Sequence, residues 1–366
     1  MRVEGRVVTP DGVVESGYVE VAGDTIVTVG TGAPATGRWI VPGFVDIHTH
    51  GGGGHTFTTG DAAAAREGAA FHLRHGTTTL LASLVSSPYE LMRDATAAFA
   101  PLVAEGVLAG IHYEGPYLSE VRCGAQNPAY LRDPSTEELA ALIALGGGAV
   151  RMVTIAPERR GALDAIKLLG SHGVVAAIGH TDATYDQTLA GIDAGATVGT
   201  HVFNGMRPPH HREPGPVFAL LGADSVVCEL IPDGIHLHDG TLAFAAKVTG
   251  PDRAVLITDA MAAAGMPDGE YELGGQAVVV ADRVARLARD GSIAGSTLTM
   301  DAALRQAVHA GVSMVDAVRM ATTTPARAIG VAGEVGALAP GLRADLVVLD
   351  EELRVERVMR AGAWLS

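Results

Sequence analysis

The sequence predicts an α/β fold in which eight parallel strands and their helices close into a (β/α)8 barrel. Eight short apolar runs alternate with Ala- and Leu-rich helical stretches through the middle of the chain. Near-continuous apolar strands are typical of parallel sheets that are buried on both faces. The chain has 366 residues, which suits one large barrel with a small appended domain.

The expected barrel strands lie in order at Trp39–Ile47, Thr77–Ser83, Val107–Tyr113, Val150–Ile155, Val174–Ile178, Ala196–Val202, Ser225–Ile231 and Arg253–Thr258. The alternative is an open doubly wound sheet, which would need a glycine-rich phosphate turn after its first strand. The glycines at Gly51–Gly54 follow a strand, but they adjoin a His-x-His pair and lack dinucleotide-binding spacing. A flexible loop near a ligand explains them better.

The two ends of the chain predict a separate β-structure. Residues Arg2–Val29 and Ala344–Trp364 alternate apolar and polar positions, and turn residues interrupt the first segment. We therefore expect residues 1–41 and 336–366 to form one small β-sandwich beside a barrel of residues 42–335. A β-rich insertion is expected at about residues 269–295, after the eighth barrel strand.

Composition narrows the class of protein. Hydrophobic residues make up 48% of the chain and charged residues 18%, which is enough for a large core. The net charge of −15 argues against a nucleic-acid partner. No apolar stretch of about 18 residues predicts a membrane span, and the N-terminus does not resemble a signal peptide. Cys123 and Cys228 lie far apart, as expected for a protein of the reducing cytoplasm.

Histidine and acidic residues recur where the expected strands end. Functional side chains of (β/α)8 barrels gather at this end of the strands. Positions i and i+2 of a strand share a face, so two histidines in that spacing can hold one ion. Imidazole and carboxylate ligands suit Zn²⁺ and similar ions, which lower the pKa of a bound water to about 7. The expected metal ligands are His48, His50, Glu114, His180, His201 and Asp259.

The other histidines receive no metal role. A single histidine is more often a packed or surface residue than a ligand. His55 and His112 lie near the expected site but out of phase with its ligands, so they are at most supporting residues. The remaining ones are expected at the surface or in helices: His72, His75, His172, His210, His211, His238 and His309.

Several segments resemble a known family. Pro42–Gly51 resembles the first-strand signature of the amidohydrolase superfamily. Narrower matches run in order to the C-terminus and are similar to the N-acetylglucosamine-6-phosphate deacetylase family. They lie at His112–Leu118, Gly179–Thr181, Thr200–Met206, Arg212–Gly215, Asp233–His236, Thr258–Met261 and Gly295–Met300.

The resemblance implies an enzyme that hydrolyses N-acetyl-D-glucosamine 6-phosphate to glucosamine 6-phosphate and acetate, in amino-sugar catabolism or cell-wall recycling. It implies one or two divalent ions per subunit, with Zn²⁺ favoured and Fe²⁺, Mn²⁺, Co²⁺ or Cd²⁺ as alternatives. His48 and His50, with Asp259 nearby, would hold one ion. His180 and His201 would hold the other, and Glu114 would bridge them. Asp259 would be the general base and then the general acid.

The resemblance also implies a set of substrate contacts. Arg212 would reach the sugar phosphate across the interface of a homodimer or a dimer of dimers. Many relatives have a histidine where this chain has Gln126, which donates a neutral hydrogen bond but carries no proton. The expected substrate-binding residues are Ala125, Gln126, Asn204, Gly205, Arg212, Asp233, His236, Ile293, Ala294 and Gly295.

Two other functions are compatible with these segments. The first is hydrolysis of another acylated amino sugar, an N-acyl amino acid or a cyclic imide on the same scaffold. The second is a scaffold protein without activity, which should have lost the metal ligands that this chain retains. Branches with a carbamylated lysine are disfavoured because the two lysines, Lys167 and Lys247, do not lie at strand ends.

Overall fold

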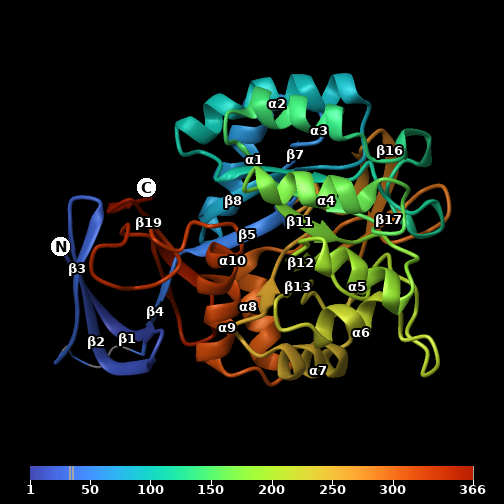
Figure 1. The fold of residues 1–366 in the computed structure, drawn as a ribbon. Helices are drawn as coiled ribbons and strands as arrows, with labels where there is room; N and C mark the ends of the chain where they lie inside the picture. Colours follow the sequence, from blue (N-terminus) through green and yellow to red (C-terminus); the bar gives the residue numbers. More distant parts are fainter. Residues whose placement is uncertain (33, 35–36, 366) are drawn as a thin grey trace.

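The computed structural model describes residues 1–32, 34 and 37–365 and contains the predicted barrel (Figure 1). Eight parallel strands form one sheet in which each strand pairs with the next along the chain. Parallel neighbours require a crossover connection, and a helix forms each of these crossovers. The strands are β5 (Phe44–Thr49), β8 (Thr77–Leu84), β9 (Gly110–Glu114), β10 (Val150–Ile155), β11 (Val175–Ile178), β12 (Val198–Gly199), β13 (Val227–Leu230) and β14 (Ala254–Leu256).

Helices cover the outside of the barrel (Figure 1). Local capping helps to define where they begin: the Asp61 side chain accepts from two backbone N–H groups at the start of α1, and Ser135 caps α3. The helices are α1 (Ala62–Arg74), α2 (Tyr89–Ala104), α3 (Thr136–Gly146), α4 (Ala162–Ser171), α5 (Tyr185–Asp193), α6 (Gly215–Gly222), α7 (Asp239–Thr249), α8 (Met300–His309), α9 (Met314–Ala321) and α10 (Thr323–Ala328). Two short 3₁₀ turns, Glu120–Arg122 and Pro128–Tyr130, lie in the loop after β9.

The barrel closes where the segment after β14 meets β5. The Asp259 N–H donates to the His48 carbonyl at 2.9 Å, and the His50 N–H donates to the Ala260 carbonyl at 2.7 Å. These bonds continue the ladder past the last strand. They also place Asp259 beside the histidines of the first barrel strand, although more than two hundred residues separate them in the chain.

The expected first strand, Trp39–Ile47, is in fact two strands. β4 (Trp39–Pro42) belongs to a second sheet, and β5 begins the barrel at Phe44. Gly43 joins them where a Cβ would lie only 2.2 Å from Thr78 Oγ1. The run was predicted as one strand because both halves are apolar and buried, so burial alone does not mark the boundary.

The two ends of the chain share a seven-stranded sheet at the side of the barrel (Figure 1). The sheet curls so that its β3 edge meets the segment before β18: the Ile26 N–H donates to the Leu342 carbonyl at 2.9 Å, and the Ala344 N–H to the Asp24 carbonyl at 2.6 Å. The sheet thus encloses a small apolar core as a β-sandwich. Its strands in spatial order are β20 (Ala363–Trp364), β19 (Val355–Arg360), β18 (Leu346–Leu349), β4, β1 (Arg2–Thr9), β2 (Gly12–Ala22) and β3 (Thr25–Thr31).

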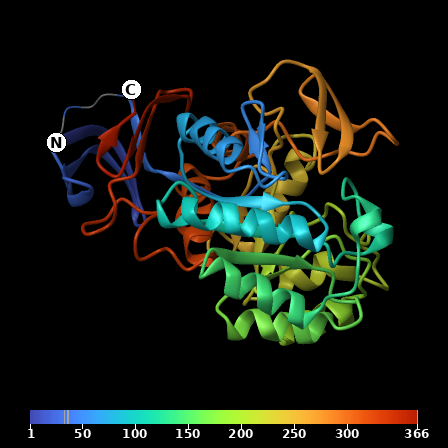
Figure 2. The ribbon, with the colours of Figure 1, turned by 90° about the horizontal axis from the view of Figure 1, so that it is seen from above.

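A three-stranded antiparallel sheet follows the eighth barrel strand (Figure 2). It consists of β15 (Gly269–Leu273), β16 (Gln276–Ala281) and β17 (Val284–Leu287). Its apolar side chains pack with Val85 and Met261, which follow β8 and β14. The sheet therefore lies against the carboxyl ends of the barrel strands, where the predicted site residues gather.

Smaller features complete the fold. A hairpin of β6 (Gly51–Gly52) and β7 (His55–Thr56) follows the first barrel strand. Cys123 and Cys228 are both free thiols. Within the part of the chain that the structure describes, no helix combines the length and apolar character required to cross a membrane.

The α2–α3 side of the barrel offers a stability test on one helix. Leu142 of α3 is completely buried, whereas Leu145 of the same helix is 44% exposed. Replacing Leu142 with Ala leaves a cavity and should lower the free energy of unfolding by ~2–5 kcal/mol, measured by urea denaturation. Leu145→Ala is the matched control and should change it by less than about 0.5 kcal/mol. Equal losses would contradict the packing of α3.

Candidate metal centre and substrate cavity

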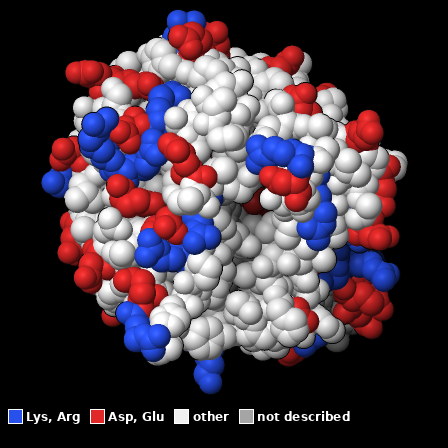
Figure 3. Space-filling view, turned by 90° about the vertical axis from the view of Figure 1, so that its right-hand side faces the viewer, with Lys and Arg blue, Asp and Glu red and all other residues white. Residues whose placement is uncertain are grey.

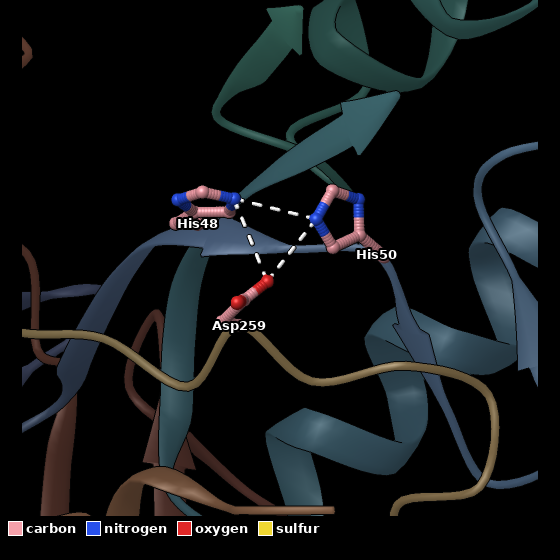
Figure 4. A group of neighbouring side chains, drawn as sticks. All are labelled: His48, His50 and Asp259. Carbon is pink, nitrogen blue, oxygen red and sulfur yellow. Dashed lines mark hydrogen bonds and ion pairs between the residues drawn. The ribbon is translucent and has the colours of Figure 1, made fainter. Parts of the chain in front are cut away.

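The six predicted metal ligands converge at the carboxyl ends of the barrel strands. They form two groups whose ligand atoms lie within 4.8 Å of one another: His48, His50 and Asp259 in one, Glu114, His180 and His201 in the other. Figure 4 shows the first group, with both imidazoles and the Asp259 carboxylate directed toward a common point. All six side chains are buried.

The first group is compact. His48 Nε2 lies 3.3 Å from His50 Nε2, as the i, i+2 spacing predicts for one face of a strand. Asp259 Oδ1 lies 3.2 Å from His50 Nε2 and 3.6 Å from His48 Nε2. Two imidazole nitrogens and one carboxylate oxygen therefore face one position.

Glu114 joins this group to the second one. Its Oε1 lies 3.0 Å from His180 Nε2 and 2.8 Å from His201 Nε2. Its Oε2 lies 3.2 Å from His50 Nε2. One carboxylate thus faces both sets of imidazoles, which is the geometry needed of a bridging ligand.

The Nδ1 atoms, which point away from the centre, fix the orientation of two of the histidine rings. His50 Nδ1 donates to the Ser83 carbonyl at 3.0 Å, and His180 Nδ1 donates to the Arg122 carbonyl at 2.8 Å. A carbonyl oxygen only accepts, so Nδ1 carries a hydrogen and Nε2 faces the centre. These residues therefore fit a divalent ion with nitrogen and oxygen ligands, such as zinc.

Electrostatics favour a cation at this position. Burial would raise the pKa of Glu114, but His48 and His180 outweigh it and hold that pKa well below its usual range. Burial would also raise the pKa of Asp259, but the charge of His48 and the hydrogen bond from His50 outweigh it and lower that pKa. Both carboxylates are therefore ionised at neutral pH and available as ligands.

Three of the six residues have left-handed backbone conformations: His180 (φ 44°), His201 (φ 28°) and Asp259 (φ 49°). Such strain is uncommon outside glycine and is concentrated at functional sites. The structure corrects the expected position of His201, which lies beyond β12 rather than within a strand. The short strand ends at Gly199, and the turn that follows directs the imidazole to the centre.

A cavity of about 300 Å³ lies over the two groups. Figure 3 views the face of the molecule remote from the seven-stranded sheet, and this face is hollowed near its middle. Seven of the ten expected substrate-binding residues line the cavity: Ala125, Gln126, Asn204, Gly205, His236, Ile293 and Gly295. The cavity and the metal ligands thus form one site.

The other three expected contacts do not line this cavity. Ala294 is buried in the core of the three-stranded sheet. Asp233 holds His236 instead, since its Oδ2 lies 2.6 Å from His236 Nδ1. Arg212 is exposed in the loop between β12 and α6, where its Nη1 lies 2.7 Å from His211 Nε2.

Comparison with known proteins agrees with this architecture. A model described as "Amidohydrolase family" matches residues 39–365. The chain belongs to the amidohydrolase family. Members of this family depend on metal ions, and the two groups of this amidohydrolase are candidate sites for them.

Several relatives of this amidohydrolase are sugar-phosphate deacetylases. It is 38% identical over 336 residues to an N-acetylglucosamine-6-phosphate deacetylase of Lysinibacillus sphaericus, covering 89% of this chain and 85% of the relative. It is 40% identical over 333 residues to an N-acetylgalactosamine-6-phosphate deacetylase of Escherichia coli O157:H7, covering 89% and 88%. The crystal structure of N-acetyl-D-glucosamine-6-phosphate deacetylase from Mycobacterium smegmatis is 47% identical, with a TM-score of 0.96 and complete coverage of both chains.

Gln126 has a defined place in the amidohydrolase site. Its Nε2 donates to Glu114 Oε2 at 2.6 Å, and its Oε1 accepts from the Ser86 N–H at 2.6 Å. The amide is therefore held at both ends. It orients the Glu114 carboxylate while it lines the cavity.

Sequence reasoning missed Glu229, which is fully buried on β13 beneath the histidines. Its Oε2 lies 3.0 Å from His48 Nδ1. A signal was present, because a glutamate interrupts the otherwise apolar run Val226–Ile231. His112, expected to be at most a supporting residue, packs edge-on against His48 with ring centroids 4.6 Å apart.

His72 supports the glycine hairpin that follows His50. It was expected either at the surface or in a helix, and it lies on α1. The side chain is completely buried, and its Nε2 donates to the Gly51 carbonyl at 2.9 Å. Burial lowers the pKa of His72 from 6.5 to about 4. The unfolded chain therefore binds a proton at pH values where the folded protein does not, so acid favours unfolding.

We predict that His72 makes stability depend on pH. Between pH 6.5 and about 4, the free energy of unfolding should decrease by up to ~3 kcal/mol through this residue as the pH is lowered. His72→Leu should flatten this part of the stability profile measured by urea denaturation. His309→Gln is the control, because that side chain is 75% exposed. An unchanged slope in His72→Leu would contradict the assignment.

Proposed function

We propose that this amidohydrolase hydrolyses the acetamide of N-acetyl-D-glucosamine 6-phosphate, giving glucosamine 6-phosphate and acetate. The observation that carries the proposal is the pair of ligand groups joined by Glu114 at the floor of a cavity. The relatives support this substrate class, since a point mutant of the Mycobacterium smegmatis enzyme has been solved in complex with N-acetyl-D-glucosamine-6-phosphate. That structure is 48% identical and has a TM-score of 0.96.

A second candidate substrate is N-acetylgalactosamine 6-phosphate. The N-acetylgalactosamine-6-phosphate deacetylase of Escherichia coli is 40% identical to this chain, and the N-acetylglucosamine-6-phosphate deacetylase of Lysinibacillus sphaericus is 38% identical. The two sugars differ only in the configuration of one hydroxyl group. Their discrimination would therefore depend on how the cavity contacts that hydroxyl.

In the proposed metal centre, His48, His50 and Asp259 would hold one divalent ion, and His180 and His201 would hold a second. The Glu114 carboxylate faces both groups and would serve as a ligand to both. Zn²⁺ is the preferred ion because its usual ligands are imidazole nitrogens and carboxylate oxygens. A divalent ion at this position supplies Lewis acidity that polarises the acetyl carbonyl and lowers the pKa of water.

Asp259 is the proposed general base and acid. Its carboxylate lines the cavity and is ionised at neutral pH, so it can accept a proton from the attacking water. It then delivers that proton to the amine nitrogen as the C–N bond breaks. Without this proton the leaving group would depart as an unstable amide anion, so one residue serves both steps.

The cavity residues would orient the sugar. The Asn204 and Gly205 backbone lies beside His180, and a Cβ at Gly205 would approach His180 Nδ1 to 2.6 Å. His236, held by Asp233, would contact the sugar or its phosphate. Gly295 and Ile293 would line the sugar pocket. We further propose that the protein is cytoplasmic and forms a homodimer or a dimer of dimers. Arg212 of one subunit would then complete the substrate site of the other.

Acetate release tests the proposed function. N-acetyl-D-glucosamine 6-phosphate should be hydrolysed much faster than its unphosphorylated form, and chelation followed by Zn²⁺ addition should abolish and restore the rate. N-acetylgalactosamine 6-phosphate measured in parallel decides between the two sugar phosphates. Equal rates with and without the phosphate group would refute a phosphate-dependent substrate site.

We predict that Asp259→Asn reduces kcat by at least ~10²-fold, because an amide neither accepts nor delivers the proton. Circular dichroism and thermal unfolding should show a folded protein. Asp290→Asn is a control carboxylate, since its side chain is 42% exposed. Substantial turnover by Asp259→Asn would exclude it as the base.

Arg212→Ala should raise KM by roughly 10- to 100-fold, as expected when a hydrogen bond to a charged group is lost. Mixing Arg212→Ala with Asp259→Asn protein then tests the shared site. A hybrid dimer with Arg212 donated across the interface contains one intact site, so activity at substrate concentrations well below the raised KM should increase after subunit exchange. No recovery in hybrids confirmed by mass spectrometry would place Arg212 outside the partner's site.

A further inference from the structure

A buried carboxylate connects the two ligand groups from below. Glu229 lies on β13 with no exposed surface. Its Oε2 lies 3.0 Å from His48 Nδ1 and accepts from the His201 N–H at 3.1 Å. One oxygen atom therefore contacts the imidazole of one ligand group and the backbone of the other.

Burying the Glu229 carboxylate lowers the stability of the fold. Glu229 Oε1 is buried and has no hydrogen-bond partner among the described residues. A buried carboxylate with a free oxygen costs stability, and an apolar residue would fit better in the middle of a barrel strand. The cost indicates that Glu229 serves the site rather than the fold.

His48 differs from the other proposed ligands in its outer partner. His50 and His180 donate to backbone carbonyls, and His201 Nδ1 has no partner among the described residues. His48 alone of the four has a carboxylate at this position. A carboxylate fixes the hydrogen on Nδ1, as a carbonyl does. Its negative charge also makes Nε2 more basic, and therefore a stronger metal ligand.

Glu229 contacts the backbone of His201, whereas it contacts the side chain of His48. The His201 backbone is strained at φ 28°, and Glu229 accepts from its N–H directly at this turn. Loss of that acceptor would leave a buried N–H unpaired and allow the turn to relax. Glu229 thus sets the direction of both a side chain of the first group and a turn of the second.

We propose that Glu229 is a positioning residue that holds the two ligand groups in register and gives the His48 group its metal affinity. The inference rests on the proposed function, because it assumes that the two groups hold metal ions. Glu229 has two roles: its charge serves His48, and its acceptor oxygen also supports the His201 turn.

Two substitutions distinguish these roles. Glu229→Gln retains an acceptor oxygen but removes the charge, so the affinity for one ion should decrease by ~10- to 100-fold and the second should be retained. Glu229→Leu removes both contacts, so both ions should bind more weakly. Zn²⁺ affinities would be measured by chelator competition and stoichiometry by inductively coupled plasma mass spectrometry. The absorption spectrum of the Co²⁺-loaded protein reports the coordination that remains.

Asp46→Asn is the matched control. Asp46 is also fully buried in the barrel, where it accepts from the His48 N–H at 3.3 Å and from Thr258 Oγ1 at 2.6 Å, but it contacts no imidazole of the centre. Asn retains an acceptor oxygen for these groups, so Asp46→Asn removes a buried charge that faces only backbone and hydroxyl groups. Its substitution should affect thermal stability without selective loss of one ion. Because Glu229→Gln preserves shape, it keeps the test valid even if Glu229→Leu does not fold.

The outcomes separate this inference from the proposed function. A wild-type protein that binds two ions, with a Glu229→Gln variant of unchanged affinities, would overturn the role of Glu229 alone. Equal weakening of one ion in Glu229→Gln and Asp46→Asn would also overturn it, because any buried carboxylate would then suffice. A wild-type protein that binds no divalent ion would overturn both proposals.

Discussion

The carboxylate of Glu114 is the contact on which the centre depends. It lies within 3.2 Å of imidazole nitrogens from both ligand groups. Burial opposes its ionisation, and the surrounding imidazoles reverse that effect. Gln126 holds the carboxylate in place with a neutral amide, which adds a hydrogen bond without adding a competing charge.

The barrel supplies this arrangement by closing on itself. Hydrogen bonds between β5 and the segment after β14 place Asp259 against His48 and His50. Short strands and left-handed turns then direct the side chains inward, at a local cost in backbone strain. The rest of the barrel, packed around a large apolar core, stabilises these conformations.

The fold class was predictable because buried parallel strands leave a clear record of apolar runs. The two ends of the chain also showed the alternation of half-buried strands, and their segments form the seven-stranded sheet. The boundary at Gly43 was not predictable from burial, since β4 and the start of β5 are both apolar and largely buried, and only their strand partners distinguish them. Register and sheet membership depend on partners far away in the chain.

The sequence by itself determined which chemical groups stand at the ends of the barrel strands, because residue type and strand position are local properties. It also indicated the family through ordered motifs such as Asp46–His50. Only the tertiary structure decided which groups meet: it brought six ligands together, placed Glu229 beneath them, and left Arg212 and Ala294 outside the cavity. The reason is physical, since these contacts join residues from different strands, and only barrel closure sets the distances between them.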